Sequence, residues 1–149
     1  MSWLAGCLIA HAVLARAVPS PWWVPDLTLV GLLLAVAKAP SRWLLLSVVA
    51  GLFTMVWAVR FPKQVFLSYV ALGWVVQMLG RQWDATDPRV QVGMVGLASA
   101  LLTLGGLWLD ELWSFPLLGL SMVRVAMTLL AVPCVRHVTE RRVRPPRRA

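Results

Sequence analysis

The chain has 149 residues, of which 60% are hydrophobic and only 13% are charged, and its formal net charge is +8. A soluble domain usually carries about 25% charged residues, so this chain lacks the polar side chains needed to cover a water-exposed surface. The composition therefore excludes a soluble globular protein and predicts an all-α integral membrane protein.

Six apolar runs, separated by charges or prolines, are predicted to be transmembrane helices. In chain order they are residues 2–18, 22–37, 43–59, 64–80, 90–109 and 112–135. A span needs about 20 residues, so the first two are short and reach across only by snorkelling, by local thinning of the bilayer or under cover of neighbouring helices. The first run resembles the apolar part of a signal peptide, with a cleavage-like sequence at residues 15–17, but no Lys or Arg precedes it. We therefore expect a retained helix.

The distribution of Lys and Arg between the predicted loops indicates how the bundle is oriented. With six spans both termini share one side, and that side carries ten Lys and Arg residues against three on the other. The ten are Lys38, Arg42, Arg81, Arg89 and six arginines near the C-terminus, and the three are Arg16, Arg60 and Lys63. The positive-inside rule then places both termini in the cytoplasm.

The C-terminal end of the chain is predicted to be a basic tail. We assign residues 1–137 to the six-helix transmembrane domain and residues 138–149 to this cytoplasmic tail. Arg136, Arg141, Arg142 and Arg144 are expected to face anionic lipid headgroups, because they directly follow an apolar helix. Nucleic acid is not an expected partner, since no aromatic residue lies between the arginines to stack on bases.

The pattern of reactive side chains gives no indication of catalysis. His11 and His137 are far apart, no Ser lies in a nucleophile-elbow sequence, and no pair of acidic residues falls within a span. Cys7 and Cys134 lie inside apolar runs without metal-ligand spacing. We therefore expect no enzymatic activity, no metal site and no cofactor.

A single arginine, Arg124, interrupts the sixth apolar run. An arginine at the middle of a bilayer costs about 2.5–3.5 kcal/mol, so it should face protein or water and find a partner. Residues 114–116, Ser-Phe-Pro, are typical of a helix start, which places Arg124 in the outer half of the span. The acidic residues on that side are Asp26, Asp110 and Glu111. One hypothesis is that Arg124 pairs with Asp26; the other is that it receives an acidic or carbonyl group from another subunit or a substrate.

Small residues in the fifth run are candidates for close helix packing. In the sequence GMVGLASA, Gly93 and Gly96 are spaced to let another helix approach closely. The neighbour could be a helix of the same bundle or one of a partner protein, and the sequence leaves both readings open.

The sequence VPDLTLVGLLLAVAKAPSR, residues 24–42, resembles a segment of the rod shape-determining protein MreD family. In that family an aromatic-rich boundary and a Pro with Asp or Asn precede an apolar helix and a small basic cytoplasmic turn. The likeness continues in outline through Gly51, the short turn at 60–63 and the basic close of the last helix, over about residues 22–142. The chain departs from the family after Gly51, where it has neither the acidic residue nor the Pro-x-Gly turn that members often carry.

This resemblance implies a non-enzymatic scaffold of the elongation cell-wall synthesis machinery in the bacterial cytoplasmic membrane, with a role in cell shape. Its implied partners are an MreC-like single-span protein and, beyond it, the actin-like MreB filament and peptidoglycan synthases. The implied fold is similar to the six-helix substrate-binding subunits (S-components) of energy-coupling-factor vitamin transporters.

That similarity supplies an alternative function: a membrane subunit that binds a vitamin or an ion and works with an ATPase module. The outer residues that could converge on a ligand are Trp22, Trp23, Asp26, Trp108, Asp110, Glu111, Trp113 and Arg124. A proton-coupled transporter or small channel is a third class, but the spans lack the intramembrane carboxylate that it would need. We rank the scaffold first, the binding subunit second and the transporter third.

Overall fold

A computed structural model of the chain describes residues 2–19, 23–58, 61–84, 87–109 and 115–143. Within these ranges the chain is helical, with turns and bends between the helices and no strand. The elements are α1 (Ser2–Ala17), α2 (Leu27–Lys38), the short 3-10 helix η2 (Pro40–Arg42), α3 (Trp43–Trp57), α4 (Pro62–Leu79), α5 (Pro88–Leu109) and α6 (Phe115–Val143). The predicted all-α class is therefore confirmed.

Helix α2 is the centre of the bundle, and it packs against each of the other five α-helices. Every side chain from Leu27 to Leu34 is buried, and so is Val36. A helix that is apolar on all sides needs this kind of enclosure, because no face of it is suited to water. At 12 residues, α2 is about 18 Å long, and neighbouring helices cover most of its surface.

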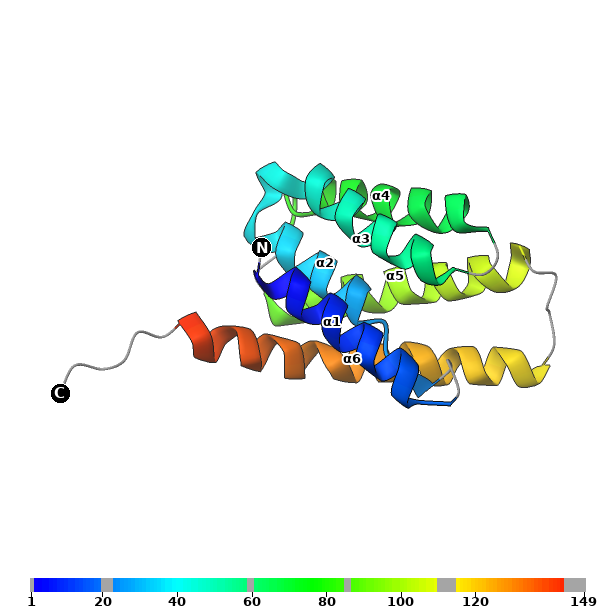
Figure 1. Cartoon of the computed structure of the whole chain (residues 1–149). Coiled ribbons are helices and arrows are strands. Elements are labelled where there is room, and N and C mark those ends of the chain that lie inside the picture. Colours follow the sequence, from blue (N-terminus) through cyan, green and yellow to red (C-terminus); the bar gives the residue numbers. More distant parts are fainter. Residues whose placement is uncertain (1, 20–22, 59–60, 85–86, 110–114, 144–149) are drawn as a thin grey trace.

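The α-helices form pairs of chain neighbours, and α2 belongs to one of them. The most extensive contacts join α1 to α2, α3 to α4 and α5 to α6. The N-terminus of α1 and the C-terminal end of α6 lie on the same side of the molecule (Figure 1). The C-terminal end of α2 lies on that side too, since Lys38 and Arg42 line one cavity with Trp3 of α1.

Glycines allow the backbones to approach where these helices cross. A Cβ added to Gly31 would come within 2.7 Å of the Cys7 side chain of α1, and one added to Gly51 would come within 2.9 Å of Phe66 of α4. A Cβ at Gly73 of α4 would overlap the Ser47 hydroxyl of α3. These glycines serve close packing inside the bundle, as small residues do between membrane helices.

The surface of the bundle is largely apolar. Two helical segments, Pro88–Trp108 and Phe115–Val138, are long and apolar enough to cross a membrane, and the most apolar window of each is only 22% and 17% buried inside the protein. A core helix of a soluble protein would be mostly buried, so these windows instead present apolar side chains outward. Large apolar side chains are also exposed on α1, α3 and α4: Ile9, Val13, Leu44, Leu45, Leu52, Val56, Leu67, Trp74 and Met78.

Two boundaries differ from the sequence prediction by five residues or more. The second run was predicted to start at Trp22, but α2 starts at Leu27, because Pro25 and the capping Asp26 precede it. The sixth run was predicted to end at residue 135, whereas α6 continues through Pro133 to Val143 and so includes the first half of the predicted tail. The polar residues after 135 end the apolar run but not the helix, since backbone hydrogen bonding does not depend on hydropathy.

Candidate functional site

Asp26 sits at the N-terminus of the buried helix α2 and caps it. Its side-chain Oδ1 accepts a hydrogen bond from the backbone N–H of Leu29 at 3.0 Å. Aspartate is favoured at this position because it satisfies a free backbone donor and because its charge complements the positive end of the helix dipole. Only 8% of the residue is exposed, so this carboxylate must be compensated by protein groups.

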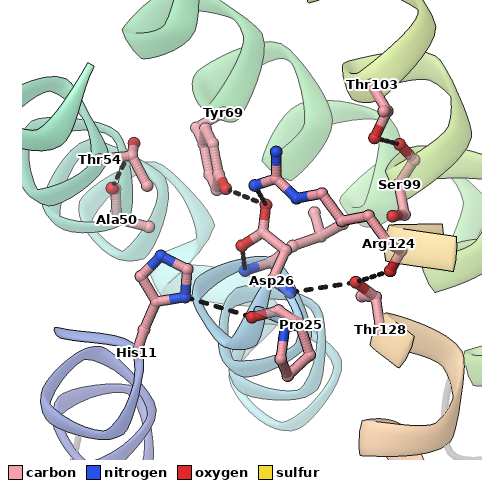
Figure 2. Close-up of polar contacts among 11 residues, drawn as sticks. His11, Pro25, Asp26, Ala50, Thr54, Tyr69, Ser99, Thr103, Arg124 and Thr128 are labelled. Atoms are coloured by element: carbon pink, nitrogen blue, oxygen red, sulfur yellow. Dashed lines mark hydrogen bonds and ion pairs between the residues drawn. The ribbon is translucent and has the colours of Figure 1, made fainter. Parts of the chain in front are cut away.

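Two side chains from other helices compensate the second carboxylate oxygen. The Tyr69 hydroxyl of α4 donates to Asp26 Oδ2 at 2.8 Å, and Arg124 Nη2 of α6 lies 3.8 Å from the same oxygen. Figure 2 shows the two side chains converging on the carboxylate. Tyr69 is buried, whereas the Arg124 side chain is 33% exposed, so Arg124 lies partly at the surface of the bundle.

Thr128 fastens the backbone of the same region to α6. The backbone N–H of Asp26 donates to Thr128 Oγ1 at 3.0 Å, and that hydroxyl donates to the Arg124 carbonyl at 2.8 Å. On the other side, His11 Nδ1 of α1 lies 3.3 Å from the Pro25 carbonyl oxygen (Figure 2). We call Asp26, Tyr69, Arg124 and Thr128 the Asp26 cluster; it joins α2, α4 and α6 at one place.

The sequence hypothesis that Arg124 pairs with Asp26 agrees with this geometry. The other two acidic candidates, Asp110 and Glu111, lie outside the described residues. Sequence reasoning missed the roles of both Tyr69 and Thr128. The available signal was that Tyr69 is the only tyrosine of the chain, placed well inside the fourth apolar run.

The two glycines of the fifth run have different surroundings. A Cβ added to Gly96 would lie 3.1 Å from Leu129 of α6, whereas one added to Gly93 would meet nothing within 4 Å. Gly96 therefore packs against a helix of the same bundle. Gly93 is exposed on the surface of α5, so of the two it alone remains a candidate for contact with a partner.

The remaining predicted residues lie at the surface or outside the described ranges. Trp23 and Trp108 are exposed, and Trp22, Trp113 and Arg144 are not described. Arg136 is part-buried on α6, and Arg141 and Arg142 belong to its last turn. Their relation to lipid stays a prediction.

The polar groups of the helices mainly bind protein. Thr54, Ser68 and Thr103 each donate to a carbonyl one turn earlier in their own helix. Among the described residues, no three His, Cys, Asp or Glu side chains gather closely enough to hold a metal ion. The chemistry of the Asp26 cluster is thus charge compensation and helix fastening, and its Arg124 side chain is partly exposed.

No protein-family model, curated protein or solved structure matches this chain.

Proposed function

We propose that the chain is a non-enzymatic scaffold of the bacterial elongation machinery, acting as MreD proteins do. One observation carries the proposal: the Asp26 carboxylate is engaged by groups from α2, α4 and α6. The main charged group of the interior thus holds the bundle together. The surface that remains is apolar on most helices, so the protein would act through its helix faces.

The proposal includes six spans in the cytoplasmic membrane with both termini in the cytoplasm. Short helices such as α1 and α3 would take part because they are packed against other helices of the bundle. The ends of the helices support this arrangement by charge. Lys38, Arg42, Arg81 and Arg89 lie at the end that the positive-inside rule assigns to the cytoplasm. The exposed Lys63 lies in the first turn of α4, at the opposite end.

Cysteine labelling in intact cells tests this topology. In a background with Cys7→Ala and Cys134→Ala, Lys63→Cys should react with a membrane-impermeant maleimide on intact cells. Ser41→Cys and Arg89→Cys should react only after the membrane is opened, because they would face the cytoplasm. The side chains of Ser41, Lys63 and Arg89 are all exposed, so whether a cysteine at these positions reacts depends on the side of the membrane it faces. Labelling of Ser41→Cys in sealed cells would refute the orientation.

Capture of the protein in nanodiscs tests the scaffold itself. The tagged chain should recover an MreC-like single-span protein together with peptidoglycan synthases. Gly93→Leu should weaken this recovery, because it adds bulk on an exposed face of α5 where an added Cβ meets no atom within 4 Å. Gly6→Leu is the matched control, since an added Cβ at Gly6 of α1 also meets no atom within 4 Å. Recovery of neither protein with the wild-type chain would count against the scaffold.

One observation favours the binding subunit as a second candidate. The Arg124 side chain is 33% exposed although it pairs with Asp26, so this arginine could also receive an anionic ligand from the outer side. Under this function the same capture experiment should recover ATPase subunits with their coupling protein in place of cell-wall proteins.

A further inference from the structure

We propose that a cavity between the C-terminal ends of α2 and α4 binds the phosphate headgroup of an anionic membrane lipid. This cavity, the α2–α4 cavity, has a volume of about 330 Å³. Its lining residues include the buried Val36 and Val76 and the polar residues Ser41, Gln77 and Arg81. The inference needs a membrane around the protein but does not depend on the scaffold function.

The polar groups of this cavity are suited to phosphate. Ser41 and Gln77 supply hydroxyl and amide donors, and Arg81 supplies the planar guanidinium that binds phosphate oxygens through paired hydrogen bonds. Within the described part of the chain, none of these three side chains is engaged by another residue. Their donors are therefore available to a ligand, in contrast to those of the Asp26 cluster.

The electrostatic surroundings also favour an anion. Lys38 and Arg42, at the same end of α2, line a smaller cavity of about 90 Å³ beside Trp3, and Lys38 Nζ lies 5.3 Å from the Trp3 ring centroid. None of the residues that line either cavity is acidic. The negative end of the α2 dipole would oppose an anion, but Lys38 lies in the last turn and offsets it.

The apolar surroundings point to a lipid as the source of the phosphate. Ala37 and Val76 of the α2–α4 cavity also line a small, almost wholly apolar cavity that reaches Met94 and Val95 of α5. On the neighbouring outer face of α4, Val75 and Met78 are exposed. A phosphate bound at Arg81 would thus lie next to apolar surface on which acyl chains can rest. The proposed topology places this end at the cytoplasmic leaflet, where anionic lipids attract basic residues.

Lipid binding by the purified full-length protein tests the proposal. The protein in detergent is titrated with phosphatidylglycerol, and the bound lipid is counted by native mass spectrometry. Arg81→Gln should weaken binding about tenfold, because it removes the charged donor to phosphate. Arg89→Gln is the matched control: it removes the same charge from an exposed arginine at the same end that does not line the cavity. It should change binding by less than about twofold.

Three further measurements make the result decisive. Gln77→Leu keeps the charge and should weaken phosphatidylglycerol binding less than Arg81→Gln does, while phosphatidylcholine should bind weakly to all forms.

If inorganic phosphate or glycerol phosphate competes with the lipid at equal concentration, the site recognises free phosphate and the lipid assignment is wrong. If Arg89→Gln weakens binding as much as Arg81→Gln, the effect is one of surface charge and the cavity proposal is overturned. Lipid counting is independent of partner capture, so failure of one proposal is distinguishable from failure of the other.

Discussion

Replacing Asp26 with alanine should destabilise the folded protein by about 3 kcal/mol, among the largest effects of any single polar substitution in the bundle. Removing one partner of a buried ion pair usually costs about 3–5 kcal/mol, because the other charge is left uncompensated. The lower end of this range applies here because the Arg124 side chain is 33% exposed, so its charge is not fully buried when Asp26 is removed. Loss of the cap at Leu29 is part of the same cost. Thermal or denaturant unfolding in mild detergent, followed by helical circular dichroism, measures the effect.

Graded substitutions separate the parts of this effect. Asp26→Asn retains an oxygen to cap α2 but loses the charge, so it should cost less than Asp26→Ala. Arg124→Gln should also destabilise, and the double variant Asp26→Asn/Arg124→Gln should be more stable than the sum of the single effects predicts. The difference between the effect of the double variant and the sum of the two single effects is the coupling free energy of the ion pair. Strict additivity of the two substitutions would show that the pair at 3.8 Å contributes nothing.

Only the charged part of the Asp26 cluster was predictable from the sequence. A charge in an apolar run demands a partner, and the depth of Arg124 limits the choice to a few acidic residues on one side. A neutral hydroxyl does not need a partner on another helix, since it can donate to a carbonyl of its own helix, as Thr54 does. The roles of Tyr69 and Thr128 depend on how the helices are rotated about their axes, which hydropathy does not specify.

The same limit explains what the apolar runs predicted and what they did not. Their order and helical nature follow from composition, but apolar residues suit lipid and protein interior equally well. The sequence therefore did not distinguish the buried α2 from the outward-facing α5 and α6. Likewise, Gly93 and Gly96 are equivalent by spacing, and only the rotation of α5 turns one toward Leu129 and the other to the surface.

Gly73→Ala should destabilise the bundle by about 2 kcal/mol, whereas Gly93→Ala should be neutral or slightly stabilising. Overpacking a tight contact typically costs about 1–3 kcal/mol, and a Cβ at Gly73 would overlap the Ser47 hydroxyl and lie 2.9 Å from Ser47 Cβ. At Gly93 the added methyl meets nothing within 4 Å, so only the better helix propensity of alanine, up to about 1 kcal/mol, remains. Both glycines lie inside α-helices, which makes the pair a matched comparison in the same unfolding experiment.

Shortening the facing residue should reverse the Gly73→Ala effect in two steps. Ser47→Ala removes the overlapping hydroxyl but leaves a Cβ that would still lie 2.9 Å from the new methyl, so rescue should be partial. Ser47→Gly removes both atoms, and the double variant Gly73→Ala/Ser47→Gly should be more stable than the two single effects predict, because the methyl then occupies the space that the serine side chain left. A destabilisation by Gly73→Ala that neither Ser47 substitution relieves would mean that α3 and α4 do not cross at this pair of residues.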